Sequence, residues 1–150
     1  IGRTEGFGQI LEEHPNWEML ERRDGDFTQT RGQEVMTDFL HTYSDIDVVI
    51  SENDNMTFGA IEAIQEAGLT CGPEGDIIIL SFDAARAALQ AMIDGKLNVD
   101  FECNPVLGPM VSEVIQKLEQ GETVEKYQYV EETYFDPTME LETLIQERTY

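Results

Sequence analysis

Three continuous apolar runs dominate the middle of the chain, and each ends in a small polar cluster that leads into a helical pattern. The runs lie at 47–51, 76–82 and 97–103. Unbroken apolar strands that alternate with amphipathic helices are typical of a parallel sheet covered on both faces. The sequence therefore predicts an α/β fold with a parallel, Rossmann-like sheet in a three-layer arrangement.

Apolar residues at helical spacing and their flanking residues predict the helices. Thr28 or Thr30 is a candidate N-cap, and Gly68 and Gly95 are placed to end two helices. The predicted helices lie before His14, at about 30–43, 56–67, 84–93 and 106–118, and in the tail after Pro137.

Two further segments, 17–22 and 124–132, are predicted to be strands. Trp17 begins the first of them, and a tryptophan in a strand is expected in the core.

The helix predicted at 106–118 has an unusually wide apolar stripe. A stripe of this width needs a surface to pack against, because exposed apolar area is unfavourable. Its members are Val106, Leu107, Met110, Val111, Val114, Ile115 and Leu118.

The charge balance limits the classes of partner. The chain of 150 residues has 9 basic and 31 acidic residues, which gives a net charge of −22. A surface this acidic repels a phosphate backbone, so no nucleic-acid partner is expected. A single domain is the simplest organisation at this length, and no apolar run approaches the ~20 residues of a membrane span.

Polar residues at the ends of the predicted strands are the main candidates for a binding site. Asn53, Asp83 and Asn104 follow the three apolar runs, and the carboxyl ends of parallel strands meet at one edge of the sheet. Amide and carboxylate groups together suit the hydroxyl groups of a sugar. Taken singly, each could equally be a helix cap or a turn residue.

Catalysis, cofactors and metals have little support in the sequence. The nucleophile elbow GxSxG, the phosphate-binding Gly-rich motifs and HExxH are all missing. His14 and His41 fall at helix ends and are expected to be structural or solvated. Cys71 and Cys103 are expected to be buried free thiols, although the sequence alone leaves a disulfide open. We therefore expect no enzyme activity, no cofactor and no metal site.

Five segments, in order along nearly the whole chain, resemble the periplasmic sugar-binding proteins of ABC transporters, of the ribose- and galactofuranose-binding type. These segments are Gly2–Phe7, Asp24–Gly32, Glu52–Ile61, Ser81–Asp83 and Glu102–Pro105.

The resemblance implies a type I periplasmic binding protein fold, in which two lobes close on a monosaccharide and deliver it to an ABC permease. Carried over by position, it implies that Arg3 binds sugar hydroxyls, that Phe27 stacks on the sugar ring, and that Asn53 and Asp83 form hydrogen bonds with it. Asn104 or Cys103 would fall near the hinge crossing, where the family places a further polar ligand. The expected location is extracytoplasmic, in the periplasm or lipid-anchored at the outer face of the cell membrane.

The same resemblance implies that residues 1–150 are the carboxyl-terminal lobe, with 105–150 as a hinge-crossing segment and the first lobe absent. Half a cleft buries only one side of a ligand, so we expect no tight sugar binding by the chain alone. The helix at 106–118 would lose its partner lobe. We expect it to fold back onto this lobe or to form a homodimer with a second copy.

Two other classes of function are alternatives to sugar transport. The effector-binding domain of a LacI-type transcription regulator shares the two-lobed architecture, and a helix-turn-helix upstream of residue 1 would distinguish it. A small α/β enzyme is disfavoured by the missing nucleophile and phosphate motifs.

Overall fold

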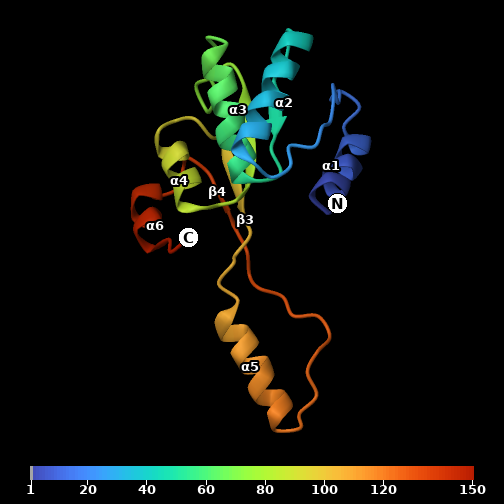
Figure 1. Ribbon diagram of the computed structural model, residues 1–150, viewed down its shortest axis with the longest axis vertical. Coiled ribbons are helices and arrows are strands. Elements are labelled where there is room, and N and C mark those ends of the chain that lie inside the picture. The colour runs from blue at the N-terminus through green and yellow to red at the C-terminus, as the bar shows by residue number, and fades with distance from the viewer. Residues whose placement is uncertain (1) are drawn as a thin grey trace.

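The computed structural model describes residues 2–150 and contains a four-stranded sheet flanked by helices (Figure 1). In order across the sheet, the strands are β1 Val48–Ile50, β2 Ile78–Asp83, β3 Val99–Glu102 and β4 Tyr134–Phe135. The first three strands are parallel, with Val49 beside Ile79, and β4 is antiparallel to β3. The predicted α/β fold with a parallel sheet is confirmed.

The helices begin and end close to the predicted positions. Thr28 caps α2 by accepting a hydrogen bond from the Arg31 N–H at 3.2 Å, and Asn53 caps α3 in the same way. Gly68, with a φ of 78°, lies just beyond α3 in the left-handed region that glycine adopts without strain. The helices are α1 Gly2–Glu13, α2 Gln29–Thr42, α3 Asp54–Glu66, α4 Arg86–Ile93, α5 Gly108–Glu119 and α6 Leu141–Glu147.

The core lies between the sheet and the helices that connect its strands. Ile64 of α3, Ile79 of β2 and Leu89 of α4 are fully buried in one apolar cluster. Side chains alternate along β2, so Ser81 shares the buried face while Phe82 is only half-buried. The buried face therefore fixes the register of β2 and sends Asp83 to the edge of the sheet.

Helices α2 and α3 pack very closely, because glycines remove side chains from their contact. A Cβ added to Gly59 would lie 2.0 Å from the Gln29 carbonyl oxygen, and one added to Gly32 would lie 2.5 Å from the Met56 carbonyl oxygen. This close packing holds the start of α3, and with it Asn53, against the loop that precedes α2.

The segment 17–22 does not form a strand, so that prediction is wrong. Trp17 is 50% exposed and does not enter the core. A strand needs a neighbour to satisfy its backbone groups, and none of the strands in residues 2–150 pairs with this segment. Side chains attach it to α2 instead, since the Tyr43 hydroxyl donates to the Glu21 carboxylate at 3.0 Å.

The segment 124–132 is also not a strand, and the last strand begins two residues later, at Tyr134. Figure 1 shows this segment returning from the far end of α5 toward the sheet, with no other strand beside it. The chain pairs with another strand only where it reaches β3, with Phe135 in register beside Asp100.

Helix α5 lies apart from the body of the fold, beyond the carboxyl ends of the strands (Figure 1). None of its residues is buried, and Val111, Ile115 and Leu118 are each about half exposed. The expectation that this helix folds back onto this lobe is therefore wrong, because no residue of α5 belongs to the apolar core of residues 2–150. Pairing with a second copy stays a prediction.

The two cysteines are free, and only one of them is buried as expected. Burial raises the pKa of the Cys71 thiol, whereas Cys103 is exposed at the end of β3. Across residues 2–150, every helix is too short or too polar to cross a bilayer.

Candidate functional site

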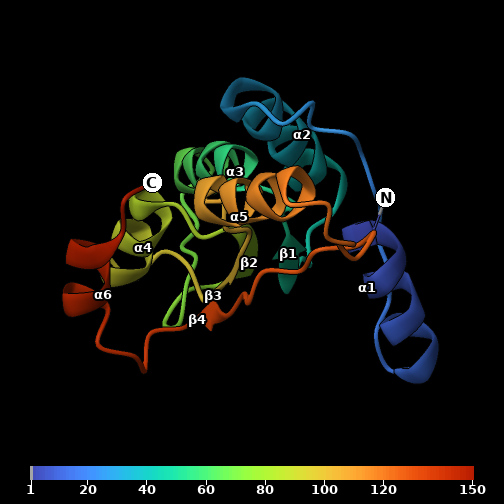
Figure 2. The ribbon, with the colours of Figure 1, turned by 90° about the horizontal axis from the view of Figure 1, so that it is seen from below.

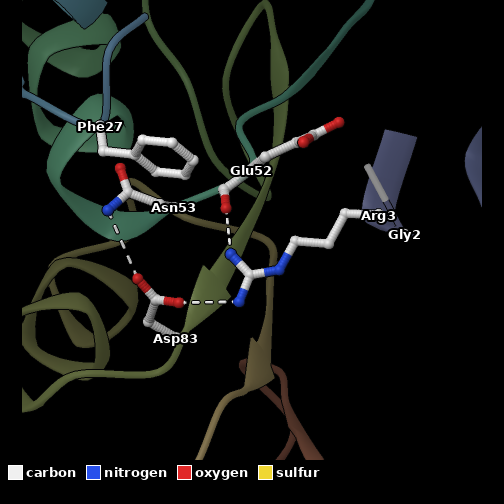
Figure 3. Close-up of a pocket in the computed structure, with 6 residues that line it drawn as sticks. All are labelled: Gly2, Arg3, Phe27, Glu52, Asn53 and Asp83. Atoms are coloured by element: carbon white, nitrogen blue, oxygen red, sulfur yellow. Dashed lines mark hydrogen bonds and ion pairs between the residues drawn. The ribbon is translucent and has the colours of Figure 1, made fainter. Parts of the chain in front are cut away.

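A cavity of about 420 Å³ opens at the carboxyl edge of the sheet (Figure 3). It is lined by residues from four separate segments: the first turn of α1, the loop before α2, the turn between β1 and α3, and the end of β2. The lining residues are Gly2, Arg3, Phe27, Glu52, Asn53 and Asp83. Four of the five predicted site residues therefore lie around one cavity.

Arg3 reaches from α1 to the end of the sheet. Its Nη2 donates to Asp83 Oδ1 at 2.9 Å, and its Nη1 donates to the Glu52 carbonyl oxygen. The guanidinium also lies over the Phe82 ring, 4.7 Å from the ring centroid. Figures 1 and 2 show α1 beside the sheet on the side away from α4 and α6, so these contacts tie it to the site.

Asn53 serves both as a helix cap and as part of the cavity wall. Its Oδ1 accepts from the Met56 N–H at 2.9 Å, and its Nδ2 donates to Asp83 Oδ2 at 3.4 Å. The cap fixes which way the amide faces, so that the NH₂ group points toward Asp83. Asn53 is 7% exposed, and its hydrogen bond to the first turn of α3 holds the side chain in place.

Asp83 and Ala84 adopt unusual backbone conformations at the point where β2 ends. Their φ angles are 115° and 53°, in a region that residues with a Cβ rarely adopt. Two buried carboxyl groups hold this turn, since the Ala84 N–H donates to Asp100 Oδ1 at 3.2 Å and the Ala85 N–H donates to Asp54 Oδ2 at 2.8 Å. The turn directs both Asp83 oxygens toward Arg3 and Asn53.

The end of the chain supports the same turn from its other side. Arg148 Nε donates to the Ala84 carbonyl oxygen at 2.8 Å, and Arg148 Nη1 donates to Glu102 Oε1 at 2.6 Å. The Tyr150 hydroxyl also donates to Glu102 Oε1, at 2.6 Å. Burial raises the pKa of Glu102, but the hydrogen bonds from Tyr150 and Arg148 outweigh it, so that the pKa is lowered overall.

Sequence reasoning missed these supporting residues. Arg148 lies 64 residues from Ala84, and no local pattern signals such a contact. Asp100 carried a signal, because it is a carboxyl group in the middle of an apolar strand, where an acid is rarely found without a partner.

Phe27 supplies an apolar wall to the cavity. It follows a tight turn in which Asp24 Oδ1 accepts from the Asp26 N–H at 2.8 Å, and its own φ is 54°. The ring is 65% exposed and borders the cavity beside Asn53 (Figure 3). An exposed aromatic face next to fixed polar groups suits the C–H face of a sugar ring.

Asn104 is the one predicted site residue that does not line the cavity. Its Oδ1 accepts from the Val106 N–H at 2.8 Å, and its own N–H donates to Glu132 Oε1 at 3.1 Å. In this structure it is a turn residue between β3 and α5, which was the alternative interpretation.

The site has the chemistry of a polar binding surface. Arg3 offers donors, Asp83 offers acceptors and Asn53 offers both, which is the mixture that a polyhydroxylated neutral ligand needs. His14 and His41 are exposed, as expected. Within residues 2–150, no three side chains of His, Cys, Asp or Glu are grouped as a metal site requires.

The sequence of this chain matches a known family and several of its members. Residues 1–123 match the sequence profile described as the periplasmic binding protein domain. The chain is 33% identical over 148 residues to the galactofuranose-binding protein YtfQ of Escherichia coli, which covers 96% of this chain and 46% of that protein. The chain thus spans about half the length of the curated relatives it matches.

Solved structures show the same fold. A Mycobacterium smegmatis protein in complex with β-D-fucofuranose is 37% identical, with a TM-score of 0.88 over 96% of this chain and 46% of that one. The periplasmic binding protein component of the arabinose ABC transporter of Shewanella sp. ANA-3, bound to α- and β-L-arabinofuranose, is 31% identical. Its TM-score is 0.89, over 98% of this chain and 49% of that one.

Proposed function

Because the chain belongs to the periplasmic binding protein family, we propose that it forms half of the binding site of a solute-binding protein that serves an ABC sugar importer. The ligand is a monosaccharide held between two lobes. Binding proteins of this family carry solutes rather than convert them, which agrees with the lack of catalytic motifs in the sequence.

One observation supports this proposal above all: two side chains that lie 80 and 30 residues before Asp83 in the sequence both reach its carboxylate. Arg3 and Asn53 each form a hydrogen bond with one Asp83 oxygen. All three line a cavity that Phe27 borders. Such fixed donors and acceptors beside an apolar surface are what orient a sugar in a binding site.

We assign the chain to the carboxyl-terminal lobe, with 105–150 as the segment that crosses the hinge. The path of the chain supports this assignment. It leaves the sheet after Glu102, forms α5 at a distance, and returns to pair Tyr134 with Phe101 (Figure 1). The first lobe would supply the other half of the cleft and a surface for α5.

The proposed partner is an ABC permease, and the proposed location is extracytoplasmic, with a lipid anchor as a further prediction. A relative that is 31% identical belongs to an arabinose ABC transporter, which favours transport over the transcription-regulator alternative. Ligands of two relatives are furanoses, β-D-fucofuranose and L-arabinofuranose, so sugars that populate a furanose ring are tested first.

The test is calorimetric titration of pentoses and hexoses into two proteins: this chain alone, and a two-lobed protein of the relatives' length that contains it. We expect binding at micromolar concentration or tighter only in the two-lobed protein, because half a cleft buries one side of the ligand. A two-lobed protein that binds none of the sugars contradicts the proposed function.

Matched arginine variants of the two-lobed protein test the assigned site. Arg3→Met removes the donors that face the cavity, and a bond to a charged group contributes about 1.5–3 kcal/mol, so affinity should fall about ten- to hundredfold. Arg31→Met is the control, since Arg31 pairs with Glu34 on the exposed surface of α2. Equal sugar affinity in both variants would place the sugar elsewhere.

A further inference from the structure

Two carboxyl groups lie buried together directly beneath the site. Asp54, the first residue of α3, is 3% exposed, and Asp100, in the middle of β3, is fully buried. The two carboxyl groups accept from the adjacent backbone N–H groups of Ala85 and Ala84, which places both beneath the same turn. Neither group takes part in an ion pair with any residue in 2–150.

The two carboxyl groups differ in the hydrogen bonds that they accept. Asp54 accepts at both oxygens, from the Ser81 hydroxyl at 2.6 Å and from the Ala85 N–H at 2.8 Å. Asp100 accepts at Oδ1 only, and its buried Oδ2 receives no hydrogen bond from the residues that the structure describes. Two ionised carboxylates this close repel each other. A proton on Asp100 Oδ2 removes one of the two charges and lets this otherwise unpaired oxygen donate a hydrogen bond.

The groups around the pair do not compensate a second negative charge. Asp83, from the end of β2, adds a further acid, and Arg3 of α1 is already paired with it. Arg148 of the tail is paired with Glu102, at the end of β3. Phe135 of β4, in register with Asp100, is apolar. Arg86, in the first turn of α4, forms no ion pair within residues 2–150.

We propose that Asp100 is a positioning residue of the site that stays a neutral acid and donates a hydrogen bond to the Asp54 carboxylate beneath the Asp83–Ala85 turn. The pair holds the N–H groups of Ala84 and Ala85 and so keeps Asp83 in its unusual conformation, facing Arg3 and Asn53. The part of this proposal that concerns sugar affinity rests on the proposed function.

The proposal has a defined pH dependence. Burial, and then the charge of Asp54, raise the pKa of Asp100 to about 9. Folding raises the pKa of this acid, so its contribution to the stability of the folded state is fully present below the pKa that it has in the unfolded chain. This contribution is lost as the pH rises toward its pKa in the folded chain. The loss therefore extends from about pH 4, the pKa of an unfolded Asp, to about pH 9.

The experiment compares unfolding of the 150-residue chain and its Asp100→Asn variant in denaturant at several pH values. An Asn amide donates to Asp54 as a neutral acid does but cannot ionise. The ratio of the unfolding constants, unchanged chain over variant, should rise about tenfold per pH unit between about pH 5 and pH 8. The control Asp45→Asn removes an exposed carboxylate and should leave this ratio within about twofold across the range.

A second measurement keeps the test decisive if a variant fails to fold. Carbon NMR of the Asp100 carboxyl group should show a protonated acid at neutral pH in the unchanged chain. A ratio that does not change with pH, or an ionised Asp100 at neutral pH, would overturn the proposal.

The role in positioning is tested by sugar affinity in the two-lobed protein. Asp100→Asn should keep the affinity within about threefold, because the donor to Asp54 remains, whereas Asp100→Leu should lower it more than about tenfold. Equal affinity in the two variants would contradict a positioning role. If the unchanged protein binds no sugar, the proposed function fails, while the unfolding and NMR results still decide the state of Asp100.

Discussion

Helices α3 and α5 have similar lengths and similar apolar stripes, yet they lie in opposite environments. Seven residues of α3 are buried, including Ile64, which is fully buried in the core. No residue of α5 is buried, and Ile115 is 50% exposed. An amphipathic pattern therefore predicts that a helix forms, but the surface that covers its stripe depends on the rest of the molecule.

The same contrast applies to the two parts of the proposed binding site. The half that the structure contains is fixed by α3, whose cap residue Asn53 reaches Asp83. Helix α5 lies beyond the same edge of the sheet and contributes nothing to the cavity lining. If α5 belongs to a second lobe, as we propose, its exposed stripe and the half-formed site have the same cause.

The largest effect should come from shortening the matched isoleucines. Ile64→Ala removes buried methyl groups and leaves a cavity, so it should lower the free energy of unfolding by about 2–5 kcal/mol. Ile115→Ala in the chain alone should change it by less than about 0.5 kcal/mol, since no core surrounds that side chain. Denaturant unfolding followed by circular dichroism measures both values.

An equal loss of stability in the two isoleucine variants would contradict the contrast between the helices. It would mean that α5 packs on the rest of the chain in solution, which is one of the two arrangements expected from the sequence. A change in the slope of the denaturant transition would separate an altered unfolded state from a true loss of packing.

The central strands of the sheet were predictable because each of them is a continuous apolar run in the sequence. The apolar runs that became β1, β2 and β3 are unbroken in the sequence, so strands there follow from composition alone. Their burial is uneven, since β1 is only half-buried and Ile78 of β2 is 44% exposed. The segments 17–22 and 124–132 failed because a strand also needs a neighbour with free backbone groups, and nothing local in a sequence shows whether that neighbour exists.

A smaller effect should come from adding one methyl group to a matched pair of glycines. Gly59→Ala places a Cβ against the Gln29 carbonyl oxygen in the close contact of α2 with α3, so it should lower the free energy of unfolding by about 1–3 kcal/mol. Gly108→Ala in the first turn of α5 meets no atom within 4 Å and should be neutral or slightly stabilising.

Thermal and denaturant unfolding of the two alanine variants measures this difference. A stable Gly59→Ala protein would show that α2 and α3 can separate at little cost. Asn53 would then be held less firmly than its cap suggests.

The juxtaposition of Asn53 and Asp83 could be predicted from the sequence, because parallel strands end at a common edge. The positions of Arg3 and Phe27 came only from the resemblance to a family, since neither follows a strand. Asp100 and Arg148 could not be assigned roles in advance, because their contacts join segments 16 to 64 residues apart through the packed fold. Sugar binding by these residues stays a prediction.

The smallest effect concerns pairing of α5 with a second copy, where hydrophobic contact and charge oppose each other. The net charge of −22 repels two copies, but α5 carries only two acids and one base, so its stripe lies in a region of low charge. At about 0.15 M salt, charges more than about 8 Å apart are largely screened. Sedimentation at this and higher salt should therefore show self-association of the chain that strengthens as salt is added.

The double variant Val111→Gln with Ile115→Gln tests whether the stripe is the contact surface. It removes two apolar side chains that dimerisation would bury, so self-association should weaken about tenfold or more, which is about 1.4 kcal/mol. The control, Glu113→Gln with Lys117→Gln, has the same spacing but removes an exposed ion pair and leaves the net charge unchanged. It should change the association constant less than about threefold, because such pairs contribute about 0.2–0.5 kcal/mol. A chain that stays monomeric at every concentration and salt would show that α5 remains uncovered without its proposed second lobe.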